Sequence, residues 1–222
     1  NDDSIYYAEE QSGFLAGYAA VIDGYTSLGF MGGMAVPAVV RFGHGFVQGA
    51  EAAAVELNVD VTVKYEYLNS FAPDDAHKTK ALAWYSEGVE AIFVAAGGAG
   101  LSVMAAADTL DNAKVIGVDV DQSNLSDSVI TSAMKNLTGS VYEALVDYYA
   151  DDFKGGVIDT LDVTKDGVGL PDDFSRFATF TKAKYDEIYA KLVNGTVVVK
   201  KDAAKVMDLV LTKVVITLIG SE

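Results

Sequence analysis

The chain has 222 residues, half of them hydrophobic, which is enough to bury one large domain or two small ones. Its 32 acidic and 16 basic side chains give a formal charge of −16, which argues against binding to nucleic acid or to an anionic membrane surface. Because the chain has no cysteine, disulfides, thiolate catalysis and thiolate metal sites are excluded. The two histidines, His44 and His77, match no zinc-binding spacing.

The sequence contains no stretch of the roughly 18 uninterrupted apolar residues that a membrane span needs. Its first residues, Asn1-Asp2-Asp3, are acidic where a signal peptide would be positive. We therefore expect that any targeting segment has been removed or never existed. The lack of cysteine is compatible with secretion.

A helix is predicted over residues 8–22, and a regular alternation of strands and helices follows it. The predicted strands span residues 28–31, 59–67, 91–95 and 115–118. The predicted helices begin at Pro37, run over residues 73–87, and pass through Met104 and Ala107. Because the central strands are apolar on both faces, this alternation predicts a parallel sheet with helices on both sides, a doubly wound α/β lobe.

The regular alternation of predicted strands and helices ends after Asp121. Strands are predicted over residues 128–134, 156–163 and 214–219, and a loop over residues 167–171. Helices are predicted over residues 138–152 and 182–193, the second ending at Asn194-Gly195.

Glycines and aspartates follow the carboxyl ends of two predicted strands, where ligands bind in open α/β sheets. Gly97 and Gly98 begin a turn that can bring backbone N–H groups close to a ligand, although an ordinary strand-to-helix turn explains them equally well. Asp119 and Asp121 can accept hydrogen bonds from vicinal hydroxyl groups such as those of ribose. Turn formation or helix capping is the alternative for each aspartate.

Two aromatic residues, Phe42 and Phe71, also follow strand ends, and either ring can stack on a flat ligand or belong to the core. A calcium loop at Asp119 is not predicted, because the sixth position lacks glycine and the twelfth lacks glutamate. We find no arrangement of a nucleophile with a base and no metal cluster, so no catalytic residue, metal ligand or cofactor is predicted.

Several motifs together resemble the basic membrane protein family, the substrate-binding lipoproteins of ABC importers that are related to the purine nucleoside receptor PnrA. The resemblance spans nearly the whole chain and is specific as a combination, although each motif alone is weak. The motifs are Glu9-Glu10-Gln11-Ser12-Gly13-Phe14-Leu15-Ala16-Gly17, Gly29-Phe30-Met31-Gly32-Gly33-Met34, Pro37, Arg41-Phe42-Gly43, Ala95-Ala96-Gly97-Gly98-Ala99-Gly100, Ile116-Gly117-Val118-Asp119-Val120-Asp121-Gln122, Thr131-Ser132-Ala133-Met134-Lys135 and Gly167-Val168-Gly169-Leu170.

The resemblance implies a type I periplasmic-binding-protein fold, in which two α/β lobes joined by three crossovers close on a nucleoside. It implies that an aromatic ring stacks on the base and that an aspartate after a strand holds the ribose. Phe42 takes the first role and either Asp119 or Asp121 the second, and Lys135 is a further candidate.

The resemblance also implies that most of the first lobe and its lipid-bearing cysteine are missing, so the chain looks like a truncated or processed receptor. The implied organisation is residues 1–27 as a first-lobe remnant, 28–121 as the second lobe, 122–155 as a crossover strand and helix of the first lobe, and 156–222 as the return to the second lobe with the C-terminal segment.

The leading hypothesis is therefore an extracytoplasmic receptor, lipid-anchored to the cell membrane, that delivers a purine nucleoside to an ABC transporter permease without catalysis. One alternative is an intracellular ligand-sensing domain of a regulator, and a less favoured one is an enzyme acting on nucleosides or sugars with Asp119 or Asp121 as base. Reaction products after incubation with nucleosides distinguish the enzyme, and membrane fractionation distinguishes the receptor from the sensor.

Overall fold

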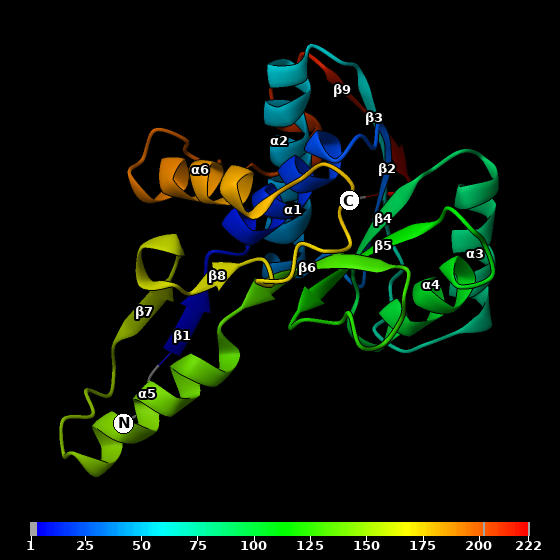
Figure 1. Ribbon diagram of the computed structural model, residues 1–222. Helices are drawn as coiled ribbons and strands as arrows, with labels where there is room; N and C mark the ends of the chain where they lie inside the picture. Colours follow the sequence, from blue (N-terminus) through cyan, green and yellow to red (C-terminus); the bar gives the residue numbers. More distant parts are fainter. Residues whose placement is uncertain (1–3, 202, 222) are drawn as a thin grey trace.

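The computed structural model describes residues 4–201 and 203–221, which form two β-sheets of unequal size (Figure 1). The acidic start, Asn1-Asp2-Asp3, lies outside the described residues. The strands of the large sheet, in their order across it, are β8 (Val168–Gly169), β6 (Val129–Lys135), β5 (Lys114–Asp119), β4 (Ala91–Ala95), β2 (Ser27–Gly32), β3 (Val61–Tyr67) and β9 (Val214–Ile219). The small sheet pairs β1 (Ser4–Tyr7) with β7 (Ile158–Leu161). Each pairing is parallel except that of β6 with β8.

Helices cover both faces of the large sheet (Figure 1). The helices are α1 (Glu9–Ile22), α2 (Pro37–Leu57), α3 (Asp75–Ser86), α4 (Gly100–Ala107), α5 (Leu137–Tyr149) and α6 (Lys182–Val193), with short 3-10 turns at Gly97–Ala99, Val163–Lys165 and Val206–Asp208. Successive residues of a strand point to opposite faces, so Phe93 lies in the core under α1 and α2, whereas Ile92 and Val94 lie in the core under α3 and α4. The predicted doubly wound α/β architecture is confirmed.

The strands predicted between residues 28 and 121 are β2, β3, β4 and β5, and the helices between them are α2, α3 and α4. Pro37 stands at the first turn of α2, as expected for a residue without an N–H group. The sequence analysis missed β1, which has four residues, and β8, which has two and lies in the predicted loop. Segments this short carry too few residues for a periodic pattern to be recognised.

The predicted division into lobes differs from the structure at two elements. We expected the strand after Ser128 to belong with the first lobe, but β6 pairs with β5 in the large sheet. Its residues from Val129 to Ala133 are buried, and only a sheet covered on both faces provides that burial. Likewise α1, expected in a first-lobe remnant, packs along α2 on the large sheet. The apolar pattern identified the strand and the helix correctly but gave no information about the elements against which they pack.

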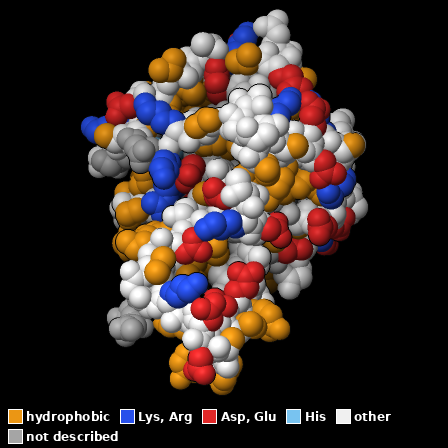
Figure 2. Space-filling view, turned by 90° about the vertical axis from the view of Figure 1, so that its left-hand side faces the viewer, with side chains coloured by type: hydrophobic (Ala, Val, Ile, Leu, Met, Phe, Trp, Pro, Cys, Tyr) orange, Lys and Arg blue, Asp and Glu red, His pale blue; other side chains and the backbone are white. Residues whose placement is uncertain are grey.

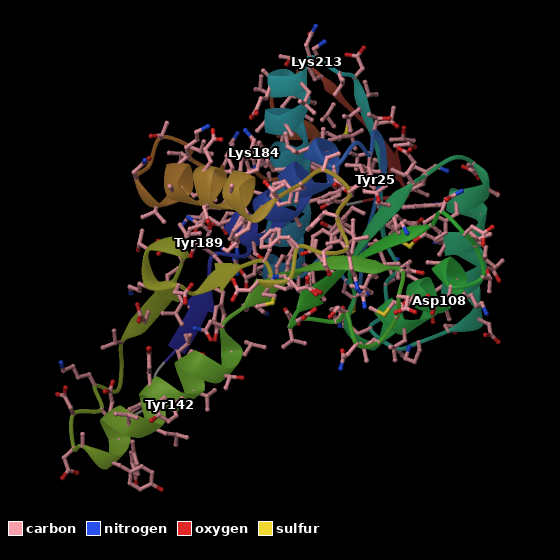
Figure 3. The ribbon with its side chains drawn as sticks, viewed as in Figure 1. Tyr25, Asp108, Tyr142, Lys184, Tyr189 and Lys213 are labelled. Atoms are coloured by element: carbon pink, nitrogen blue, oxygen red, sulfur yellow. The ribbon has the colours of Figure 1, made fainter. Side chains whose placement is uncertain are left out.

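The small sheet and α5 extend away from the large sheet (Figure 1). Their apolar side chains are unusually exposed, and Figure 2 shows hydrophobic groups gathered at the lower end of the molecule, toward which α5 extends in Figure 1. We call these residues the α5 face: Tyr6, Val141, Tyr142, Leu145, Val146, Tyr148, Tyr149, Val157 and Ile158. Tyr142, which Figure 3 labels, is 68% exposed. An apolar surface of this extent is typical of an interface.

The carboxylate of Glu51 on α2 holds the beginning of β9 against this helix. The backbone N–H groups of Thr212 and Val214 donate to the carboxylate at 2.7 and 2.8 Å, and that of Lys213 donates at 2.9 Å. Partial burial acts to raise the pKa of Glu51, but the hydrogen bonds from the Thr212 hydroxyl and these N–H groups outweigh it, so the pKa lies below its usual value.

Glu51→Gln is expected to reduce the free energy of unfolding by about 1–2 kcal/mol near neutral pH, because hydrogen bonds to a charged acceptor are stronger than those to an amide. A depressed pKa stabilises the folded state above the unfolded pKa of about 4.3, and that stabilisation disappears as the pH falls through the folded pKa. Urea unfolding between about pH 7 and 3 should therefore show the difference from wild type shrinking below about pH 4. Glu143→Gln, on exposed α5, serves as the control, and an equal difference at every pH would contradict this account.

Candidate functional site

The carboxyl ends of the parallel strands open onto a small hollow of about 190 Å³. Its walls come from α2, from the loop after β3, from the ends of β4, β5 and β6, and from the 3-10 turn after β4. The lining residues are Ala38, Val39, Phe42, Phe71, Ala95, Gly97, Val118, Asp119 and Lys135. The hollow thus brings together four of the six residues that the sequence predicted for the site, and adds Phe71 beside them.

Phe71 offers a flat, accessible ring at this hollow. The side chain is 37% exposed and lies against two glycine-containing loops. A Cβ atom at Gly33 would lie 2.2 Å from a ring carbon of Phe71, so only glycine lets the ring approach the loop after β2. The Phe71 carbonyl accepts a hydrogen bond from the Ala99 N–H at 2.9 Å, which fixes the backbone that carries the ring.

Phe42, in contrast, is almost fully buried, with 2% of its surface exposed. Its ring contacts Phe93 edge to face, with 5.9 Å between the ring centroids, and therefore belongs partly to the core under α2. It also lines the hollow. Phe42 is thus a core residue that also forms part of the wall of the hollow, and its stacking on a ligand stays a prediction.

Asp119 lies at the rim of the hollow in an unusual backbone conformation. Its φ angle is 69°, and the Val120 N–H donates to the Val118 carbonyl at 2.8 Å, closing a three-residue turn around it. Turns of this kind are rare and strained, and such strain clusters at functional sites. The carboxylate pairs with Lys135, with 2.9 Å between Oδ1 and Nζ, and the Asp119 side chain is 42% exposed. It therefore presents a held, solvent-accessible acceptor to the hollow.

Asp121 and Gly98 lie outside the hollow. Asp121 accepts a hydrogen bond from the Ser123 N–H at 2.9 Å, which is the turn-forming role considered for it. It lines a neighbouring, more polar hollow of about 490 Å³, which also includes Lys135 and Tyr189, the latter labelled in Figure 3. Gly98 is exposed, and a Cβ there would approach the Phe71 carbonyl at 3.1 Å. The sequence pattern indicates only that a residue lies near a strand end. It therefore could not distinguish these two residues from the neighbouring ones that line the hollow.

Tyr7 is a site-associated residue that the sequence analysis missed. Its ring lies 5.6 Å from the Lys135 ammonium, on a strand too short to be recognised from its pattern. Among the described residues, no group of three or more His, Cys, Asp or Glu side chains is arranged to hold a metal ion. None of the described helices combines the length and hydrophobicity needed to cross a bilayer.

A solved solute-binding protein of an ABC transporter system, from Aeropyrum pernix K1, has the same fold with a TM-score of 0.77 and 21% sequence identity, covering 90% of this chain and 67% of that one. The chain therefore has part of a type I periplasmic-binding-protein fold, as the sequence resemblance implied.

The model of the family described as "ABC transporter substrate-binding protein PnrA-like" matches residues 1–203, and the chain belongs to this family. It is 36% identical over 173 residues to Basic membrane protein B of Borreliella burgdorferi, covering 76% of this chain and 50% of the relative. It is 34% identical over 214 residues to the ABC transporter nucleoside-binding protein BmpA of Lactococcus lactis, covering 86% of this chain and 60% of the relative. The chain thus spans about half to three-fifths of the length of these curated relatives.

Proposed function

We propose that this chain forms the greater part of the ligand-holding structure of an extracytoplasmic receptor that delivers a nucleoside to an ABC importer. Family membership and the name of the Lactococcus relative support this function. The observation that carries it is the hollow itself, where the accessible Phe71 ring lies beside the Asp119 carboxylate. An aromatic face and a fixed acceptor match the two chemical parts of a nucleoside, the flat base and the hydroxyl-bearing ribose.

In this proposal Phe71 stacks on the base, and Phe42 closes the inner end of the hollow. Asp119 accepts hydrogen bonds from the ribose hydroxyls, and Lys135 holds the carboxylate in place. Gly97, whose φ angle is 53°, keeps the loop after β4 free of a side chain beside the ring. Asp121 and Gly98 support the loops rather than the ligand. A purine is the favoured base because its larger face gains more from stacking.

Calorimetric titration of the complete receptor with a panel of purine and pyrimidine nucleosides, free bases, ribose and peptides tests the ligand class. Stacking and charged hydrogen bonds in a closing cleft are expected to give dissociation constants near or below about 1 μM for purine nucleosides. Heat from a sugar or a peptide, together with none from any nucleoside, would overturn the assignment. Analysis of the same mixtures for cleaved nucleosides should find the ligands unchanged, as expected for a receptor without catalysis.

We further propose that the small sheet and α5 belong to the first lobe, which closes over the hollow in the complete receptor. The exposed α5 face supports this proposal, since soluble proteins avoid leaving such a surface and open strand edges uncovered. The 222-residue chain alone should self-associate in sedimentation experiments and bind nucleosides poorly, whereas the complete receptor should be monodisperse. A monomeric 222-residue chain with full nucleoside affinity would refute the two-lobe arrangement.

We also propose that the receptor works with a permease in the membrane and that a lipid anchor holds it at the cell surface. Membrane fractionation of the native protein tests the anchor. Recovery in the membrane fraction, with release by a lipase that removes the acyl chains, is expected. Recovery in the cytosol would favour a ligand-sensing regulator instead.

Phe71→Ala is expected to weaken purine nucleoside binding by about 5- to 150-fold, because stacking of a base on an aromatic ring contributes about 1–3 kcal/mol. Phe71→Trp should retain most of the affinity, since it preserves a flat aromatic face. Calorimetry on the complete receptor provides the measurement. Val55→Ala, an exposed position on α2, is the control and should bind as wild type does. Unchanged binding by Phe71→Ala would show that the base lies elsewhere.

A further inference from the structure

The ammonium group of Lys135 is enclosed by two aromatic rings and one carboxylate. Its Nζ atom lies 5.7 Å from the centre of the Phe42 ring, 5.6 Å from that of Tyr7, and 2.9 Å from Asp119 Oδ1. Both ring distances are within the range of cation–π attraction. The Lys135 side chain is only 15% exposed, so these groups replace much of the water that would otherwise surround the charge.

Tyr7 comes to this position from a different part of the chain. It ends β1, where it pairs with Leu161 of β7, and its hydroxyl contacts the Ser140 hydroxyl at the start of α5. Lys135 ends β6, where its backbone pairs with Val168 of β8. Tyr7 and Lys135 therefore stand at the ends of two strands, β1 and β6, after which the chain passes between the small sheet or α5 and the large sheet.

We propose that Tyr7 is a positioning residue whose ring fixes the Lys135 ammonium beside Asp119. This inference rests on the proposed function for its consequence in binding, since Asp119 is the acceptor assigned to the ribose. A lysine side chain is long and flexible, and without a second aromatic wall its ammonium is free to leave the carboxylate. Asp119 then loses its fixed orientation, and the ligand has to restore it at a cost in affinity.

The first test is a double-mutant cycle on the complete receptor with guanosine as the probe. Tyr7→Leu should weaken binding about fivefold, within the range expected for a desolvated cation–π contact, and Tyr7→Phe, which keeps the ring, should remain within about twofold of wild type. In a Lys135→Met background, Tyr7→Leu should have no further effect, because the residue on which it acts is absent. An equal loss in both backgrounds, or none in either, would overturn the proposal.

The second test does not depend on a ligand. In protein labelled with ¹³C-lysine, the Hε signals of Lys135, assigned by their loss in Lys135→Met, should lie upfield of those of exposed lysines because two rings face the end of the side chain. Tyr7→Leu should move them toward the exposed lysines, whereas Tyr7→Phe should not.

The matched control is Tyr6→Leu, on the same strand but with its side chain directed to the other face. Lys135 signals that do not respond to Tyr7→Leu would refute the positioning role. Responsive signals in a receptor that binds no nucleoside would uphold it while refuting the proposed function.

Discussion

Asp119→Asn is expected to weaken nucleoside binding by the complete receptor about tenfold or more. Hydrogen bonds to a charged acceptor contribute about 1.5–3 kcal/mol, which corresponds to roughly 10- to 150-fold in the dissociation constant. Asparagine keeps the size of the side chain and tolerates the positive φ angle of this position, so the melting temperature should change little. The substitution also removes the ion-pair partner of Lys135. This second change is expected to weaken ligand binding further without lowering the melting temperature.

The matched control for this experiment lies two residues further along the chain. Asp121→Asn makes the same chemical change outside the hollow, where the side chain accepts a hydrogen bond from the Ser123 N–H. It should leave the affinity within about twofold of wild type. Calorimetry measures both variants. If Asp121→Asn weakens binding and Asp119→Asn does not, the ribose lies in the neighbouring hollow that Asp121 lines.

The sequence predicted the large sheet well because the apolar pattern of a buried strand can be recognised within the strand itself. The run at residues 91–95 is apolar throughout, and both faces of β4 are buried. The sequence predicted poorly which strands and helices pack against one another. The residue pattern of β6 is the same whether this strand pairs with β5 or with a strand of a separate lobe. Contacts between residues distant in sequence decide the pairing.

Topology alone was sufficient to predict that some of the candidate site residues lie close together. Gly97, which follows β4, and Asp119, which ends β5, lie together because parallel strands end at the same edge of the sheet. The order of the strands does not decide whether an aromatic ring is exposed or buried. Phe42 and Phe71 both follow a strand in the chain, yet the first is packed against Phe93 and the second lies open against Gly33. Tyr7 was missed because its role depends on a contact with a residue 128 positions away in the chain.

The largest expected effect on stability comes from glycines between α1 and α2, which run side by side. A Cβ atom at Gly17 would lie 2.0 Å from the Phe46 carbonyl oxygen, and one at Gly49 would lie 1.9 Å from the Phe14 carbonyl oxygen. Both clashes are with backbone, which cannot move aside as a flexible side chain can. The two helices are therefore in contact along their backbones, and this close approach buries the core beneath them.

Gly17→Ala and Gly49→Ala should each reduce the free energy of unfolding by about 3 kcal/mol or more, because the added methyl group forces the helices apart and loosens the core. The gain in helix propensity, about 1 kcal/mol for alanine over glycine, is too small to compensate. The corresponding fall in melting temperature is about 6–12 °C for a protein of this size. Gly100→Ala on α4 is the control, since its Cβ would make only an ordinary contact at 3.6 Å with Val94.

The double variant Gly17→Ala with Gly49→Ala should lose less stability than the sum of the two single losses. Once one methyl group has separated the helices, the second finds part of the space already open, so the two changes share a single displacement. Urea unfolding of the four proteins measures this coupling. Strict additivity would mean that each methyl group is accommodated locally, and melting at the wild-type temperature would mean that α1 and α2 are not in backbone contact.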